Sequence, residues 1–230
     1  MKKTRQRFVA ILLALFLVLP SIAGARSKVY LNGDREVPQI AITMDDCWKL
    51  GYVEKMLDLC EAYDFHMTFF PAGCVIEEKD RDIWLRMLLD GHEIGNHTQN
   101  HRKLSKLKAS QIYAELTNMQ KSLNIALGFE YDITLMRPPY GSIGGSAGST
   151  TSRFIEKYGY PHIVKWSVSQ TDPEKMLKKV KNGDILLYHS NKKDLDGLAK
   201  AIPILLERGF KLVTVSELLG LEQPEVNAGQ

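Results

Sequence analysis

Short apolar segments alternate with longer amphipathic segments along almost the whole chain, and this alternation constrains the fold more than any single motif. Apolar segments typical of strands cover residues 40–44, 66–70, 92–95, 133–136, 163–167, 185–188 and 211–215. Segments with helical periodicity cover residues 52–63, 81–89, 109–127, 153–158, 173–180 and 194–207. Such alternation predicts an α/β fold with a parallel sheet, either open or closed. Seven parallel strands favour a distorted, incomplete (β/α) barrel over an open sheet.

The N-terminus has the three regions of a secretory signal peptide. Four basic residues among the first seven precede an apolar run over residues 8–19, which is followed by Pro20 and a small-residue stretch over residues 21–25. The run is too short to span a bilayer comfortably. We therefore expect cleavage after Ala25 and export to the cell envelope or the medium, with an uncleaved membrane anchor as the alternative. A lipoprotein is not expected, because no cysteine stands at the cleavage site.

The composition of residues 26–230 predicts one domain with a substantial core. The leader holds four of the 30 basic residues and none of the 27 acidic ones, so the rest of the chain has a formal net charge of −1. This balance gives no indication of nucleic-acid binding. We expect no stable membrane insertion after cleavage, and the sequence does not indicate an oligomeric state.

Two aspartates and two histidines follow predicted strands. Asp45 and Asp46 end the buried strand over residues 40–44, and His97 and His101 would share one face of a helical turn. The carboxyl ends of parallel strands meet at one face of a barrel, so these side chains should lie close together. Two imidazoles and a carboxylate leave metal positions open for water and substrate, and the second carboxylate could act as a base. Taken singly, the histidine pair is weak evidence for a metal site, and adjacent aspartates usually form a solvated turn or a helix cap.

Two further polar segments follow predicted strands at the same face. In residues 137–141 (RPPYG) two prolines fix the backbone, so the amide of Tyr140 could be aimed as an oxyanion donor. Arg137 could pair with a carboxylate and keep it ionised. His189 ends the strand over residues 185–188 and could act as a general acid near neutral pH. The alternatives are an ordinary rigid turn and a structural histidine.

Together these motifs resemble the polysaccharide deacetylase family, the NodB-homology domain of carbohydrate esterase family four, over about residues 39–219. The matching segments are TMDD (43–46), HTQNH (97–101), RPPYG (137–141) and LYH (187–189). The resemblance implies a distorted (β/α) barrel and metal-dependent hydrolysis of an N- or O-acetyl group of a polysaccharide. It also implies that Asp46, His97 and His101 hold one divalent metal ion, usually zinc, with cobalt as the alternative.

The same resemblance assigns roles to the remaining motif residues. Asp45 is implied to be the general base, Arg137 to orient it, and His189 to be the general acid. The amide of Tyr140 would share the developing oxyanion with the metal, and Leu187 would line the pocket for the acetyl methyl group.

The sequence departs from the family pattern in its fourth motif, which usually has Asp-x-x-Asp-Trp a few residues after a tryptophan. Here Trp166 is followed by Ser169, Asp172 and Pro173. Ser169 stands where an acidic residue normally supports the general-acid histidine, and Pro173 replaces an aromatic wall of the groove. A second interpretation is therefore a metal- and carbohydrate-binding module with weakened or lost turnover.

The aromatic residues near the motifs are the candidates for contact with a sugar. Trp48 follows the aspartate pair and could stack on a sugar ring or simply pack, and Trp166 is the second candidate. The Gly/Ser-rich segment over residues 141–152 is a candidate rim loop, or merely a tolerated insertion.

Three cysteines in an exported chain leave one unpaired. We predict a Cys47–Cys74 bridge, because both residues follow strands expected to be adjacent, and a buried free thiol at Cys60.

The substrate and one rival activity are left open by the sequence. Peptidoglycan N-acetylglucosamine is the first expectation, and chitin oligomers or acetylated xylan are the alternatives. Two histidines and one carboxylate also describe non-haem iron oxygenases. Those enzymes usually have all-β scaffolds, which the strand–helix alternation disfavours.

Overall fold

The computed structural model describes residues 27–145 and 148–226. The predicted signal peptide lies outside these residues, as do residues 146–147 of the Gly/Ser-rich segment. The described strands are β1 (Lys28–Tyr30), β2 (Gln39–Asp46), β3 (Thr68–Pro71), β4 (Glu93–Ile94), β5 (Leu135–Met136), β6 (His162–Val164), β7 (Ile185–His189) and β8 (Lys211–Val213). The described α-helices are α1 (Leu50–Ala62), α2 (Arg81–Leu89), α3 (Ala109–Leu127), α4 (Thr150–Lys157), α5 (Pro173–Lys179), α6 (Lys192–Glu207) and α7 (Val215–Leu219).

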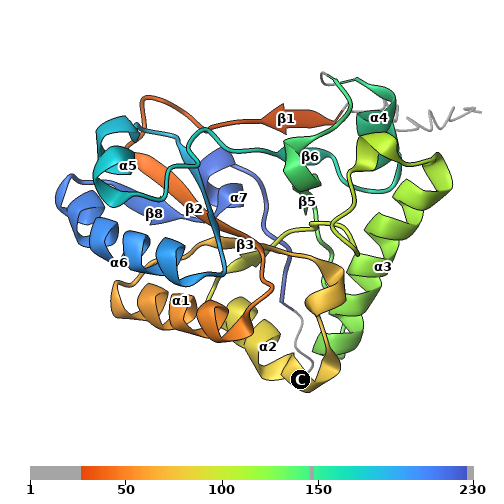
Figure 1. Cartoon of the computed structure of the whole chain (residues 1–230), viewed down its shortest axis with the longest axis horizontal. Coiled ribbons are helices and arrows are strands. Elements are labelled where there is room, and N and C mark those ends of the chain that lie inside the picture. Colours follow the sequence, from red (N-terminus) through yellow and green to blue (C-terminus); the bar gives the residue numbers. More distant parts are fainter. Residues whose placement is uncertain (1–26, 146–147, 227–230) are drawn as a thin grey trace, which may run out of the picture.

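The strands, drawn in Figure 1, form two parallel sheets, and single bridges between the sheets complete a ring. One sheet has the order β4-β3-β2-β7, with β8 also paired to β2, and the other has the order β1-β6-β5. Asn96, just beyond β4, bridges to Met136 in β5, and Val168, beyond β6, bridges to Leu186 in β7. Because two of the junctions are single bridges rather than ladders, the closure is partial. The prediction of a distorted, incomplete barrel of parallel strands is confirmed.

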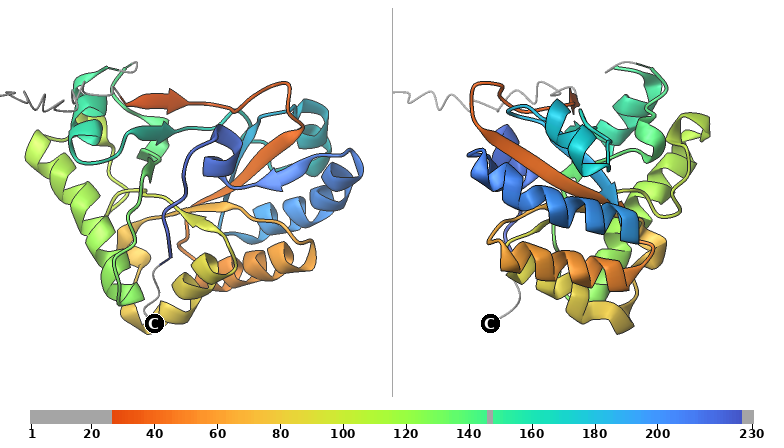
Figure 2. Two further views of the ribbon diagram at one scale, coloured as in Figure 1. Left: turned by 180° about the vertical axis from the view of Figure 1, so that it is seen from behind. Right: turned by 60° about the vertical axis from the view of Figure 1, so that its left-hand side comes forward.

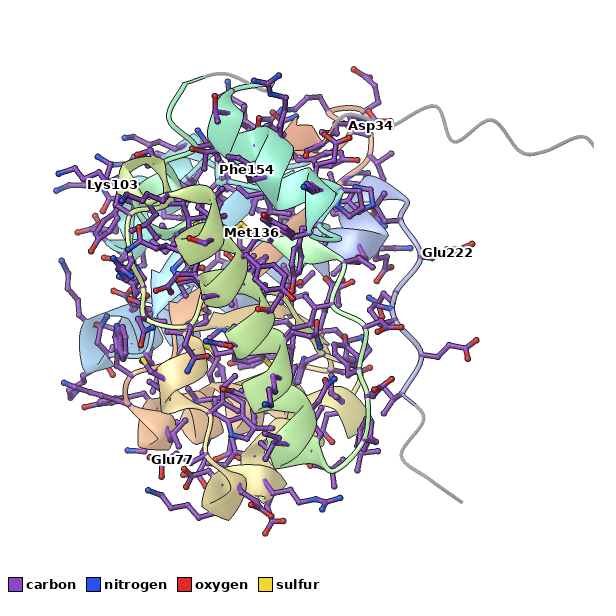
Figure 3. All side chains as sticks on the ribbon, turned by 90° about the vertical axis from the view of Figure 1, so that its right-hand side faces the viewer. Asp34, Glu77, Lys103, Met136, Phe154 and Glu222 are labelled. Carbon is purple, nitrogen blue, oxygen red and sulfur yellow. The ribbon has the colours of Figure 1, made fainter. Side chains whose placement is uncertain are left out.

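Helices surround the strands, with successive helices packed against one another. Figures 1 and 2 show α6, α1, α2 and α3 in sequence around the strands, and α4 and α5 pack against α3 and α6. Seen from the side of α3, charged residues such as Glu77, Lys103 and Glu222 project outward, whereas Met136 is fully buried behind the helix (Figure 3). None of the described helices has the length and hydropathy needed to cross a membrane.

Strand β2 shows how the sequence pattern positions the site. Ile40, Ile42 and Met44 belong to the large core cluster shared with the helices, whereas Ala41 packs in a smaller cluster. That smaller cluster fills the barrel interior with one residue from each of several strands: Ala41, Phe70, Leu135, Val164, Ile185 and Val213. Because successive strand residues point to opposite faces, Asp45 has the same orientation as Ala41. Its carboxylate therefore lies at the carboxyl end of the barrel interior.

The sequence pattern did not predict two short elements, strand β1 and helix α7. Strand β1 is an edge strand of three residues that pairs only with β6. The predicted strand over residues 211–215 ends at Val213, because Thr214 caps α7 by accepting a hydrogen bond from the Glu217 amide at 3.2 Å. A threonine three residues before a glutamate is a known helix-start signal, so α7 could have been predicted.

The predicted disulfide is wrong, since all three cysteines are free thiols in the described structure. The strands β2 and β3 are adjacent as expected, but the backbone turns through positive φ at Asp46 (66°) and Cys47 (59°). Cys47 is consequently buried in the core, while Cys74 is exposed. Cys60 is a buried free thiol as predicted, and burial raises its pKa.

Stability below neutral pH is expected to depend on His92. This buried ring accepts a hydrogen bond from the Met67 amide at 3.2 Å, and burial, with a smaller contribution from His66, lowers its pKa from 6.5 to about 4. The unfolded chain therefore takes up a proton as the pH falls below 6.5 that the folded chain does not take up until about pH 4. Between pH 7 and pH 4.5, we expect the free energy of unfolding in urea to fall by about 2 kcal/mol less for His92→Gln than for the wild type. Equal losses in the two proteins would contradict this.

Candidate metal centre

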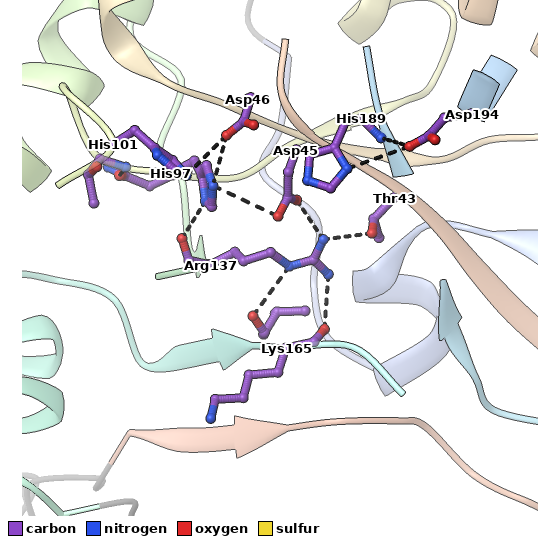
Figure 4. A network of polar contacts seen from close by, with 12 residues as sticks. Thr43, Asp45, Asp46, His97, His101, Arg137, Lys165, His189 and Asp194 are labelled. Atoms are coloured by element: carbon purple, nitrogen blue, oxygen red, sulfur yellow. Dashed lines mark hydrogen bonds and ion pairs between the residues drawn. The ribbon is translucent and has the colours of Figure 1, made fainter. Parts of the chain in front are cut away.

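The polar residues predicted from the motifs gather at the carboxyl end of the barrel. Asp45 and Asp46 end β2, and His189 ends the neighbouring strand β7 in register with Asp45. Arg137 directly follows β5, and its backbone amide bonds to the carbonyl of Asn96 at 2.9 Å. Figure 4 shows the side chains that converge there: Asp45, Asp46, His97, His101, Arg137 and His189.

The segment that holds both histidines is a loop, and the predicted helical turn is wrong. Thr98 (φ 68°) and His101 (φ 51°) are in the left-handed region, which a right-handed helical turn does not allow. The buried Asn96 side chain accepts a hydrogen bond from the Thr98 amide at 2.8 Å and donates to the Leu116 carbonyl at 3.0 Å. The loop still brings the two imidazoles to a centroid distance of 5.0 Å.

A buried glutamate on α3 holds the far side of this loop. Glu115 is 2% exposed, and its carboxylate accepts hydrogen bonds from the Asn100 amide at 2.7 Å and the Asn100 side chain at 3.2 Å. The Glu115 carbonyl also accepts from the Gln99 amide at 2.8 Å. Sequence reasoning missed both Asn96 and Glu115. For Glu115 the signal was an acidic residue on the apolar face of α3, beside the buried Ile112, Leu116 and Met119.

Three side chains form a group that could hold one metal ion. Ligand atoms of Asp46, His97 and His101 all lie within 4.8 Å of one another. Asp46 Oδ1 is 3.4 Å from His97 Nε2 and 3.2 Å from His101 Nε2. No other such cluster of histidine, cysteine and carboxylate ligands is found in the part of the chain that the structure describes.

The hydrogen bonds around this group fit a cation at its centre. His97 Nδ1 lies 2.7 Å from the Arg137 carbonyl, which can only accept, so Nδ1 carries the proton. In the neutral ring Nε2 then presents a lone pair toward Asp46 Oδ1, a second acceptor. Asp46 Oδ1 is itself buried without a hydrogen-bond partner among the described residues. Converging acceptors with no donor are costly in a buried site, and a divalent cation relieves this cost.

The charge states of the group also suit metal binding. Burial raises the pKa of Asp46, but the rings of His97, His101 and His189, when protonated, hold that pKa below its usual value. Burial and the neighbouring His97 lower the pKa of His101. A deprotonated carboxylate and a neutral imidazole are the forms in which these side chains bind metals.

Asp45 is held beside the candidate metal ligands by a buried arginine. The Arg137 guanidinium, which is fully buried, donates to Asp45 Oδ1 at 2.7 Å and to Thr43 Oγ1 at 2.6 Å. It also donates to the Lys165 carbonyl at 2.9 Å and lies 4.2 Å above the Phe70 ring. The other oxygen, Asp45 Oδ2, is 3.8 Å from His97 Nε2. One carboxylate oxygen is thus fixed by Arg137 while the other faces the candidate metal site.

The residues predicted to contact the sugar divide into two groups. Trp48 and Tyr140 are 49% and 65% exposed, and their rings lie near His101 at centroid distances of 6.0 Å and 4.8 Å. Tyr140 has a positive φ (60°), so the RPPYG backbone adopts the left-handed conformation at this residue. Leu187 is buried in β7, and the half-buried Trp166 packs over Arg137 at 5.9 Å. Trp48 and Tyr140 therefore offer more exposed aromatic surface than the half-buried Trp166.

Fold and site together define a parallel α/β barrel with a candidate mononuclear metal centre at its carboxyl end. The model of the polysaccharide deacetylase family matches residues 32–163, more than half of the chain, and the protein belongs to this family. The matched segment contains Asp45, Asp46, both site histidines and Arg137, whereas His189 lies beyond it.

Curated relatives match most of this chain in sequence. A Bacillus cereus peptidoglycan-N-acetylglucosamine deacetylase is 32% identical over 204 residues, which cover 80% of this chain and 91% of that protein. The Listeria monocytogenes peptidoglycan-N-acetylglucosamine deacetylase PgdA is 28% identical over 88% of this chain, which spans only 45% of the PgdA length.

Solved structures show the same architecture. The Bc1960 peptidoglycan N-acetylglucosamine deacetylase superposes with a TM-score of 0.77 at 26% identity, covering 86% of this chain and 95% of that one. A family pseudoenzyme from Bacillus anthracis shares the fold with a TM-score of 0.73 at 19% identity, covering 84% of this chain and 69% of that one. The fold alone therefore does not establish turnover.

Proposed function

We propose that this protein is an exported, metal-dependent deacetylase that hydrolyses the N-acetyl group of N-acetylglucosamine in peptidoglycan or a chitin-like glycan. The observation that carries the proposal is the buried Asp45–Arg137 pair beside the Asp46, His97 and His101 cluster. A purely structural site has no use for a second buried carboxylate facing the ligands. The similarity to a Bacillus cereus peptidoglycan-N-acetylglucosamine deacetylase supports the choice of substrate.

Different residues of the site can perform different steps of the hydrolysis. A divalent metal held by Asp46, His97 and His101 supplies a Lewis acid and lowers the pKa of water. Asp45 accepts a proton from the attacking water as the oxygen bonds to the acetyl carbon. His189 donates a proton to the amide nitrogen as the C–N bond breaks, so acetate and a free amine leave. Asp45 and His189 are register partners on the neighbouring strands β2 and β7, and the base is assigned to the attacking water and the acid to the leaving nitrogen.

The surroundings of the site suit a sugar chain. Trp48 and Tyr140 both offer exposed ring surface beside His101, and aromatic faces of this kind stack on sugar rings through their apolar surface. The Tyr140 amide is assigned to the developing oxyanion and the Leu187 side chain to the acetyl methyl group. The two exposed rings favour a substrate that lies across the barrel end over a small isolated ligand.

The test is acetate release by protein stripped of metal and then resupplied with zinc or cobalt. Peptidoglycan, chitin oligomers and acetylated xylan are offered side by side, and oxygen uptake is followed in parallel. We expect metal-dependent acetate from peptidoglycan and no oxygen uptake. Zinc binding without acetate from any of the three would favour a carbohydrate-binding module, and oxygen uptake would favour an oxygenase. Export is tested separately, by fractionating cells that express the full chain.

A further inference from the structure

His189 has a buried carboxylate beside it that the motifs did not indicate. Asp194 lies in the first turn of α6 and is 4% exposed. Its Oδ2 atom accepts a hydrogen bond from the His189 backbone amide at 2.8 Å and lies 3.5 Å from His189 Nδ1 (Figure 4). One carboxylate oxygen therefore contacts both the backbone and the ring of the proposed general acid.

The turn between β7 and α6 fixes this arrangement through the backbone. The Asn191 amide donates to the His189 carbonyl at 2.8 Å, and the Asn191 side chain caps α6 by accepting from the Asp194 amide at 3.0 Å. Asp194 is thus folded back over His189 by the cap of the helix. Its position does not depend on a long, flexible side chain, so the carboxylate is already in place before substrate binds.

The residues of the degraded fourth motif do not occupy this position. Ser169 is exposed, and no hydrogen bond joins it to His189 in the described structure. Asp172, the acidic residue that this segment keeps, caps α5 by accepting a hydrogen bond from the Lys175 amide at 2.9 Å. Neither residue supports the histidine, and Asp194 is the carboxylate that contacts it.

We propose that Asp194 is the positioning residue for His189, replacing from helix α6 the acidic residue that the fourth motif lacks. The carboxylate accepts a hydrogen bond from His189 Nδ1–H and holds the ring so that Nε2 is the nitrogen that faces the leaving amine. An aspartate that fixes the tautomer and stabilises the imidazolium in this way is a general device of acid–base sites. The inference deepens the proposed deacetylase function and rests on it for its catalytic meaning.

The charges around His189 agree with this pairing. Asp194 is the main cause of a pKa for His189 above its ordinary value; burial opposes that shift, and Asp45 and Asp46 on β2 add to it. His101, on the loop across the site, is the facing basic group. Removing the Asp194 charge should therefore lower the pH at which His189 loses its proton, while the two aspartates of β2 remain in place.

The test compares Asp194→Asn with Asp172→Asn in the purified, zinc-loaded protein. Asparagine keeps an acceptor for the His189 amide, so the turn is retained while the charge is lost; Asp172→Asn removes the same charge from a nearby helix cap. Ring titrations of the six histidines are followed by NMR, with His189 assigned from His189→Gln. We expect His189 to titrate at lower pH in Asp194→Asn and unchanged in Asp172→Asn.

Kinetics provide the second readout. In Asp194→Asn we expect kcat to fall about 10–100-fold with little change in KM, and the alkaline limb of the kcat/KM profile to move to lower pH. An unchanged His189 titration in Asp194→Asn overturns the inference, even if activity is lost. If the His189 titration shifts in Asp194→Asn but the wild-type protein releases no acetate, the pairing stands and the deacetylase function is rejected.

Discussion

Replacing Asp45 by asparagine is expected to abolish deacetylation while zinc remains bound. The substitution keeps the size of the side chain and its contact with Arg137, but an amide cannot accept the proton of the attacking water. General-base catalysis typically contributes about 10²- to 10⁴-fold, so kcat should fall by at least that range. Acetate release and zinc content, measured on the same sample, check the two halves of this expectation.

Asp46→Asn is the matched control for this experiment. Asp46 presents its unpartnered Oδ1 to both histidines, so its loss should weaken zinc binding itself. If Asp45→Asn lost zinc as severely as Asp46→Asn, the roles assigned to the two aspartates would be wrong.

Arg137→Gln is expected to have the largest effect on stability. The guanidinium is fully buried and satisfies Asp45, Thr43 and the Lys165 carbonyl at once. Its removal leaves the Asp45 carboxylate in the barrel without a cation, and breaking a buried pair on one side typically costs about 3–5 kcal/mol. Urea unfolding at neutral pH should show this loss, and acetate release should fall with it because Asp45 is no longer oriented.

Arg86→Gln provides the control for an arginine with several partners on the surface. Arg86 pairs with Asp58, Glu61 and Asp90, all partly or largely exposed, so its loss should cost less than about 1 kcal/mol. Similar losses in the two variants would mean that burial of the Arg137 pair contributes little.

The sequence predicts those parts of the molecule in which one local pattern decides the structure. Strands such as β2 and β7 are continuous apolar runs that end in polar residues, and α2 and α3 have the bounds that their periodicity indicates. The convergence of Asp45, the two histidines and Arg137 follows, because parallel strands place their carboxyl ends at one face. A site spread over the three strands β2, β4 and β5 is therefore visible before any contact is known.

Features set by a single backbone turn are not predictable in this way. His97 and His101 have helical spacing, yet the loop is fixed by two side chains with partners distant in sequence. Asn96 donates to the Leu116 carbonyl and the Tyr160 hydroxyl, and Glu115 accepts from the Asn100 amide. Cys47 turns into the core because of two residues at positive φ. Asp194 reaches His189 only because Asn191 caps α6. Each case depends on a long-range contact, a helix cap or a local backbone turn that periodicity does not report.

The most direct test of the account is to follow zinc binding and acetate release together. Metal-free protein is titrated with zinc in the presence of peptidoglycan, and bound zinc and released acetate are measured at every step. We predict that activity rises in proportion to zinc, reaches its maximum at about one ion per chain as a single three-ligand site requires, and is absent from Asp45→Asn at the same occupancy. Acetate release that does not depend on zinc, or a fully occupied site that releases none, would contradict the proposed mechanism.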